Sequence, residues 1–69
     1  MKYQAKIYHR NDLRSVIEAS TVKGIEAALR SHGSGQIKLH SKSPSKRVYT
    51  VYMGEGREAM GAEVRKIEA

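Results

Sequence analysis

The residues best able to do chemistry in this 69-residue chain are its cations. Thirteen Lys and Arg against seven Asp and Glu give a net charge of +6 at pH 7. Residues 1–54 hold ten basic and three acidic residues and carry +7, whereas residues 55–69 hold three basic and four acidic residues and carry −1. A basic body attracts polyanions, namely nucleic acid, an anionic membrane face or an acidic protein surface. A charge of this size also serves solubility alone.

One glycine-rich motif could bind a cofactor. The segment Gly54–Ala59 (GEGREA) fits the loose dinucleotide pattern of two glycines followed by Gly or Ala. That pattern requires a βαβ unit and an acidic ribose ligand about 20 residues downstream. Only ten residues follow Ala59, so the segment indicates a glycine-rich turn after a strand.

The remaining reactive side chains form no recognisable catalytic or metal-binding pattern. His9, His32 and His40 lack the i, i+4 helical spacing of a zinc motif. Cysteine is absent, which excludes disulfides, thiolate zinc sites and thiol catalysis. No carboxylates form an acid/base pair, and no serine lies in a nucleophile elbow. We expect a protein that is not an enzyme and that uses no metal or cofactor.

The elements that must position the cations follow from hydrophobic periodicity. Alternating residues predict strands over 2–10 and 13–19, which pair antiparallel through a turn at Asn11-Asp12. Helical spacing of apolar residues predicts a helix over 21–32, capped by Ser20 or Thr21 and ended by Gly33. Alternation returns over 36–42 and 47–53, and the second of these has the character of a central strand.

This order predicts an α+β two-layer sandwich in which one helix packs on a four-stranded, mainly antiparallel sheet (β-β-α-β-β). The domain is expected to span residues 1–56. Residues 57–69 are a C-terminal extension that could be a short helix, a strand or a frayed tail. The expected core is aliphatic, because all four aromatic residues are tyrosines, and consists of Leu13, Ile17, Val22, Ile25, Leu29, Ile37 and Leu39.

One helix covers one face of a sheet, so the opposite face is expected to be open and basic. Cations neutralise phosphates there and tyrosines stack on bases. The predicted binding residues are Lys2, Lys6, Tyr8, Arg10, Arg14, Lys38, His40, Lys42, Lys46, Arg47 and Tyr49. The favoured partner is nucleic acid, DNA or RNA, or a nucleoprotein complex. Two alternatives stay open: a face or edge that binds protein, and a solvated face without a role, since Lys commonly guards strand edges.

Two short segments carry a family resemblance. Ile17-Glu18-Ala19-Ser20-Thr21 runs into the expected helix, and Val51–Arg57 (VYMGEGR) joins a Tyr-rich strand to a glycine turn. With the order of elements, they resemble small phage and mobile-element proteins, including a short anti-CRISPR type that blocks a type I surveillance complex. The resemblance covers residues 13–60 and transfers no site residues. It implies a non-catalytic inhibitor of a host protein complex, or an accessory protein.

The expected compartment is the cytoplasm. No apolar run reaches the ~18–20 residues that span a bilayer, and Met1-Lys2 leads directly into the alternating segment and not into a signal peptide. We therefore expect no membrane partner. The thin core makes a homodimer through the open sheet or an edge strand a further possibility.

Overall fold

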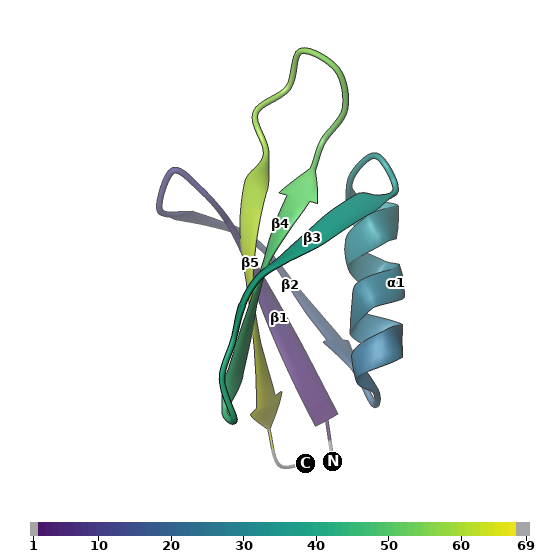
Figure 1. Ribbon diagram of the computed structural model, residues 1–69, viewed down its shortest axis with the longest axis vertical. Helices are drawn as coiled ribbons and strands as arrows, with labels where there is room; N and C mark the ends of the chain where they lie inside the picture. Colours follow the sequence, from purple (N-terminus) through teal and green to yellow (C-terminus); the bar gives the residue numbers. More distant parts are fainter. Residues whose placement is uncertain (1, 68–69) are drawn as a thin grey trace.

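The computed structural model describes residues 2–67 and consists of five antiparallel strands and one helix (Figure 1). The elements are β1 (Lys2–His9), β2 (Asp12–Ala19), α1 (Val22–His32), β3 (Gln36–Lys42), β4 (Lys46–Tyr52) and β5 (Met60–Ile67). The strands form a single sheet in the order β2-β1-β5-β4-β3. The α+β class matches the sequence expectation, but the four-stranded β-β-α-β-β plan is wrong.

The error lies in the C-terminal segment, which supplies a central strand. β5 pairs with β1 through Lys2↔Ile67 to Tyr8↔Gly61 and with β4 through Lys46↔Arg65 to Val51↔Met60. It therefore joins the β1–β2 hairpin to the β3–β4 hairpin, as Figure 1 shows. Of the three alternatives for residues 57–69, the strand forms over Met60–Ile67, while Glu68 and Ala69 lie outside the described residues.

The β1–β2 hairpin closes through a two-residue loop. Arg10 (φ 52°) and Asn11 (φ 69°) both lie in the left-handed region, which suits the twist of a tight hairpin. The register between β1 and β2 shifts after Ile7, where Ile7↔Ser15 is followed by Tyr8↔Leu13. This bulge moves Leu13 to the same side of the sheet as Tyr8.

Helix α1 is held by its cap and by two core residues. The Thr21 Oγ1 atom accepts a hydrogen bond from the Gly24 amide at 3.0 Å, as expected for an N-cap. Ile25 and Leu29 lie one helical turn apart on the side that faces the sheet and are fully buried. No helix within residues 2–67 has the length and apolar character that a membrane crossing requires.

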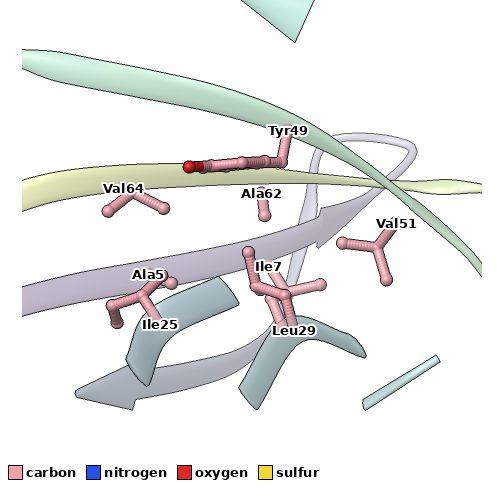
Figure 2. Packing of buried hydrophobic residues seen from close by; sticks show 8 residues of the cluster. All are labelled: Ala5, Ile7, Ile25, Leu29, Tyr49, Val51, Ala62 and Val64. Carbon is pink, nitrogen blue, oxygen red and sulfur yellow. The ribbon is translucent and has the colours of Figure 1, made fainter. Parts of the chain in front are cut away.

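The core lies between α1 and one face of the sheet (Figure 2). Its buried members are Ala5, Ile7, Ile25, Leu29, Tyr49, Val51, Ala62 and Val64. Of the predicted core residues, Ile25 and Leu29 are buried, and Ile17, Val22 and Ile37 are half-buried. Leu13 and Leu39 are exposed, at 53% and 43%. The bulge turns Leu13 away from the helix, and Leu39 lies on the edge strand β3, where no further strand covers it.

Candidate functional site

The open face of the sheet carries fewer uncompensated cations than the sequence indicates. The ladders place Lys2, Lys6 and Lys38 on this face as predicted. They also place the acidic residues Glu18 and Glu63 there. Lys2 Nζ lies 3.5 Å from a Glu18 carboxylate oxygen.

Glu63 is the strongest source of this compensation. The Arg65 Nε atom donates to a Glu63 oxygen at 2.6 Å. This hydrogen bond, and then the positive charges of Arg65, Lys46 and Lys6, hold the pKa of Glu63 below its ordinary value. The carboxylate therefore stays ionised beside three cations, Arg65, Lys46 and Lys6, on the open face.

Exposed apolar side chains also lie on this face. Val16 is opposite Lys6, and Leu13 is opposite the predicted stacking residue Tyr8. Tyr52, at the end of β4, is opposite Gln36 and is 36% exposed. The open face is thus a mixture of ion pairs and apolar groups.

Several predicted binding residues lie elsewhere. Arg10 is in the hairpin loop and is bound to Glu58, with Nη2–Oε2 at 2.8 Å. Arg14 is the extra residue of the β2 bulge, and His40 is the extra residue of a second bulge in β3; both are exposed. Neither belongs to a continuous row of cations.

Tyr49 is not available to stack on a base. It is 2% exposed, and its hydroxyl donates to a Glu26 carboxylate oxygen at 2.8 Å. Burial, and then the Glu26 carboxylate, raise the pKa of Tyr49, whereas Arg47 lowers it by a smaller amount. Tyr49 alternates in register with Val51, so the side of β4 that carries these two residues is buried. The sequence pattern, in which both sides of this strand are fairly apolar, does not decide between them.

A different arrangement of cations lies on the helix side of the sheet, beyond the N-terminal end of α1. The bulge after Leu39 turns Lys42 to this side, opposite Arg47. Arg47 is in turn opposite Val64 on β5, and Lys66 is opposite Tyr3 on β1. The expectation that Lys42 lies on the open face is therefore wrong.

These residues line a groove of about 200 Å³. Its walls are the Ser43-Pro44-Ser45 turn, the apolar side chains of Val22 and Val64, the Tyr3 ring, and four cations: Lys42, Lys46, Arg47 and Lys66. No carboxylate lines it, and none of the four cations lies within 4.0 Å of a carboxylate in the range 2–67. We call these ten residues the basic groove. The charge of Lys46 acts at longer range on Glu63 of the open face.

The groove exists because α1 is shorter than the sheet it covers. Eleven residues give a helix of about 16 Å, whereas the eight-residue strands β1 and β5 extend about 26 Å. Figure 1 shows the ends of β3 and β5 and the starts of β1 and β4 at the same end of the sheet as the start of α1. The helix-side residues at this end therefore lack a helical cover.

The turn that forms one wall is fixed by its own hydrogen bonds. The Ser43 amide donates to the Lys46 carbonyl oxygen at 2.8 Å, and the Ser43 hydroxyl donates to the same oxygen at 3.2 Å. The Lys46 amide donates back to the Ser43 carbonyl at 3.4 Å. These bonds hold the start of β4 and the end of β3 together, and with them Lys42 and Arg47.

A second hollow, of about 300 Å³, lies at the opposite end and is lined by His9, Met53, Arg57, Glu58 and Met60. It contains the Glu58 carboxylate, which Arg10 and His9 already approach to 2.8 Å and 3.6 Å. Among residues 2–67, no three His, Asp or Glu side chains gather as metal ligands would. The basic groove is therefore the stronger candidate for a binding site.

Three groove cations were predicted from the sequence, and two contributors were missed. Lys42, Lys46 and Arg47 belong to the predicted set, although two of them occupy the other face. Lys66 and Tyr3 lie outside the predicted set. The sequence indicates no single structure for residues 57–69, and the alternation of the first strand places Tyr3 with Ala5 and Ile7 on the covered face. The alternation of Ala62, Val64 and Lys66 would have placed Lys66 beside the core, had the segment been recognised as a strand.

Comparison of the chain with protein-family models, curated proteins and solved structures finds no match. The resemblance to small phage proteins therefore stays a prediction.

Proposed function

We propose that this protein is a non-enzymatic nucleic-acid-binding protein whose basic groove holds a phosphodiester backbone. The observation that carries the proposal is that four cations from three neighbouring strands line one hollow without a carboxylate: Lys42 of β3, Lys46 and Arg47 of β4, and Lys66 of β5. Cations that neutralise phosphates release counterions, and this release supplies most of the sequence-independent affinity for nucleic acid.

The shape of the groove favours a polymer over a small anion. Lys42, Arg47 and Lys66 lie on β3, β4 and β5, which are neighbours in the sheet. Two strand spacings extend about 10 Å, which exceeds the size of a single phosphate group. The row therefore fits successive phosphates of one strand.

Tyr3 supports the same partner. Its half-buried ring lines the groove, opposite Lys66 in the ladder. An aromatic ring beside a row of cations is the arrangement that binds single-stranded nucleic acid, because bases stack on the ring while cations follow the backbone. Tyr3 thus takes the role that the sequence pattern assigned to Tyr49.

The proposed partner also implies a location. A protein that binds nucleic acid acts in the compartment that holds it, and we place this activity in the cytoplasm.

The remaining predicted cations, such as Lys2, Lys6 and Lys38 on the open face, add long-range attraction for nucleic acid without direct contact.

The open face supports a second candidate, an inhibitor of a host protein complex of the phage or anti-CRISPR kind. Leu13 and Val16 are about half exposed there, beside the ion pairs of Glu18 and Glu63. A protein interface places an apolar patch inside a polar rim, and the exposed Leu13 and Val16 would supply the patch. This candidate predicts tight binding to one protein and weak, non-saturating binding to free nucleic acid.

The test is anisotropy of labelled single-stranded DNA, duplex DNA and RNA at about 50 and 200 mM salt. The double variant K42Q/R47Q removes two groove cations. The matched control K6Q/K38Q removes the same charge from the open face. We expect saturable binding by the wild type and a salt slope that K42Q/R47Q reduces by about 1.4–1.8, since each phosphate contact contributes 0.7–0.9.

The control distinguishes local contact from net charge. K6Q/K38Q is expected to weaken binding only slightly and to leave the slope nearly unchanged. Equal losses in the two double variants would mean that total charge, and not the groove, attracts nucleic acid. Absence of saturable binding by the wild type would remove the nucleic-acid proposal and leave the inhibitor.

A further inference from the structure

The two edge strands of the sheet differ in their charge. β3 carries Lys38, His40 and Lys42 and contains a bulge at His40. Like charges and a bulge are the features by which an edge strand avoids pairing with another chain. β3 is therefore a guarded edge.

β2 also has a bulge, at Arg14, but it carries no row of like charges from Arg14 to Ala19. Arg14, Val16 and Glu18 occupy alternate positions of β2, and the ladder places Val16 and Glu18 on the open face. One positive and one negative residue therefore lie two positions on either side of Val16. Val16 is 48% exposed. An eight-residue edge with a central apolar residue and opposite charges offers its backbone groups to another strand.

The pattern is complementary to itself. When two antiparallel β2 strands pair about a two-fold axis at Val16, each Arg14 stands directly opposite the Glu18 of the other copy. The two valines face each other, and on the helix side each Ser15 faces an Ile17 of the other copy. Directly opposed residues have Cβ atoms about 5 Å apart, within reach of an ion pair.

In the isolated chain, Arg14 and Glu18 both remain able to form this ion pair. Arg14 has no opposite residue on β1, because it is the extra residue of the bulge, and it forms no ion pair with a described residue. Glu18 has only long contacts, 3.5 Å from Lys2 Nζ and 3.3 Å from the Gln4 side-chain nitrogen. A carboxylate can accept further hydrogen bonds from a guanidinium.

We infer that two copies of this chain form a symmetric dimer by antiparallel pairing of their β2 strands. The dimer holds one continuous ten-stranded sheet, joined by backbone hydrogen bonds, two Arg14–Glu18 pairs and a Val16 contact. The two-fold axis is perpendicular to the sheet, so both α1 helices lie on the same side. The inference goes beyond the proposed function and does not depend on it.

The test is sedimentation velocity over about 10 to 500 µM protein, in about 0.15 M salt so that repulsion between the +6 chains is screened beyond roughly 8 Å. We expect the wild type to dimerise. R14E or E18R would turn both Arg14–Glu18 pairs of the dimer into pairs of like charge. Each variant is therefore expected to raise the dissociation constant of the dimer at least tenfold. The swap R14E/E18R restores opposite charges and is expected to restore the dimer.

Two further variants test whether dimerisation depends on the β2 edge and not on the overall charge of the protein. K38E reverses a charge on the guarded edge β3 and is expected to dimerise like the wild type. V16K places two ammonium groups opposite each other at the axis and is expected to be monomeric; Val16 is exposed, so the fold tolerates the change. Circular dichroism at the lowest concentration checks that each variant is folded.

A wild type that stays monomeric up to the highest concentration would overturn the inference. So would single reversals that dimerise like the wild type, or a swap variant that fails to recover the dimer while remaining folded.

Discussion

Arg10 and Glu58 form a two-point ion pair across 48 residues of sequence. The Glu58 Oε2 atom lies 2.8 Å from Arg10 Nη2 and 3.1 Å from Arg10 Nε. The pair joins the β1–β2 loop to the loop between β4 and β5, which Figure 1 shows at the same end of the sheet. It thereby fastens the β1–β2 hairpin to the segment that leads into the central strand.

Because of this pair, we expect the free energy of unfolding to fall at acid pH. The hydrogen bond and charge of Arg10, and then His9, hold the pKa of Glu58 below its ordinary value of 4.5. A carboxylate with a lowered folded-state pKa stabilises the fold above its unfolded-state pKa, and this contribution disappears as the pH falls through the folded-state pKa. Both side chains are largely exposed, so the effect is small.

We expect E58Q to lower the melting temperature by a few degrees at most at pH 7 and to have no effect below the pKa of Glu58. Thermal unfolding of both proteins from pH 7 to pH 3 measures the difference. The matched control is E55Q, which removes an exposed carboxylate from the same loop. A melting-temperature difference for E58Q that does not shrink in acid would contradict the ion-pair explanation.

The hydroxyl of Tyr49 links the sheet to the helix. It donates to Glu26 of α1 at 2.8 Å, while the ring fills the core between β4 and the helix (Figure 2). Tyr49→Phe keeps the ring and removes this bond, so we expect a loss of about 1 kcal/mol in the free energy of unfolding. Urea denaturation at pH 7 measures it, with Tyr52→Phe, on an exposed ring, as the control.

The same residue predicts an alkaline transition. Burial and Glu26 raise the pKa of Tyr49, so the protonated phenol stabilises the fold below the unfolded-state pKa of about 10. That contribution is lost as the pH rises through the folded-state pKa. The difference in the free energy of unfolding between wild type and Y49F should therefore narrow above pH 10. A difference that stays constant there would exclude a stabilising role for the protonated Tyr49 hydroxyl.

The sequence pattern predicted the elements with strong local signals and missed those that depend on partners. The helix, a cap at Ser20 or Thr21, and the hairpin formed by the first two strands follow from periodicity and capping. The sequence does not single out the strand among the three alternatives for residues 57–69, because only Ala62 and Val64 of β5 are buried and its stability comes from pairing on both edges. Propensity alone does not reveal such a strand, because what favours it is packing against its neighbours.

The site shows the same limit at the level of single residues. A bulge adds one residue and reverses the faces that follow it. The β3 bulge moved Lys42 to the helix side, and the β2 bulge moved Leu13 to the open side. Neither bulge has a glycine or proline to mark it in the sequence, so strict alternation assigned both residues to the wrong face.

Gly33 sets the closest approach between the helix end and the sheet. A Cβ atom built on Gly33 would lie 2.5 Å from the Tyr52 carbonyl oxygen and 2.9 Å from Val51 Cγ1. That carbonyl also accepts hydrogen bonds from the amide and hydroxyl of Ser34, both at 2.8 Å. We expect Gly33→Ala to destabilise the protein by about 2 kcal/mol or more, because backbone must move and the bonds to Tyr52 lengthen.

The matched control is Gly61→Ala. Gly61 lies in the central strand β5 with nothing within 4 Å of an added Cβ, so this change is neutral or stabilises the protein by up to about 1 kcal/mol. Urea denaturation of the two variants should separate them by at least 2 kcal/mol, and equal stabilities would mean that the end of α1 is not packed against β4 as described.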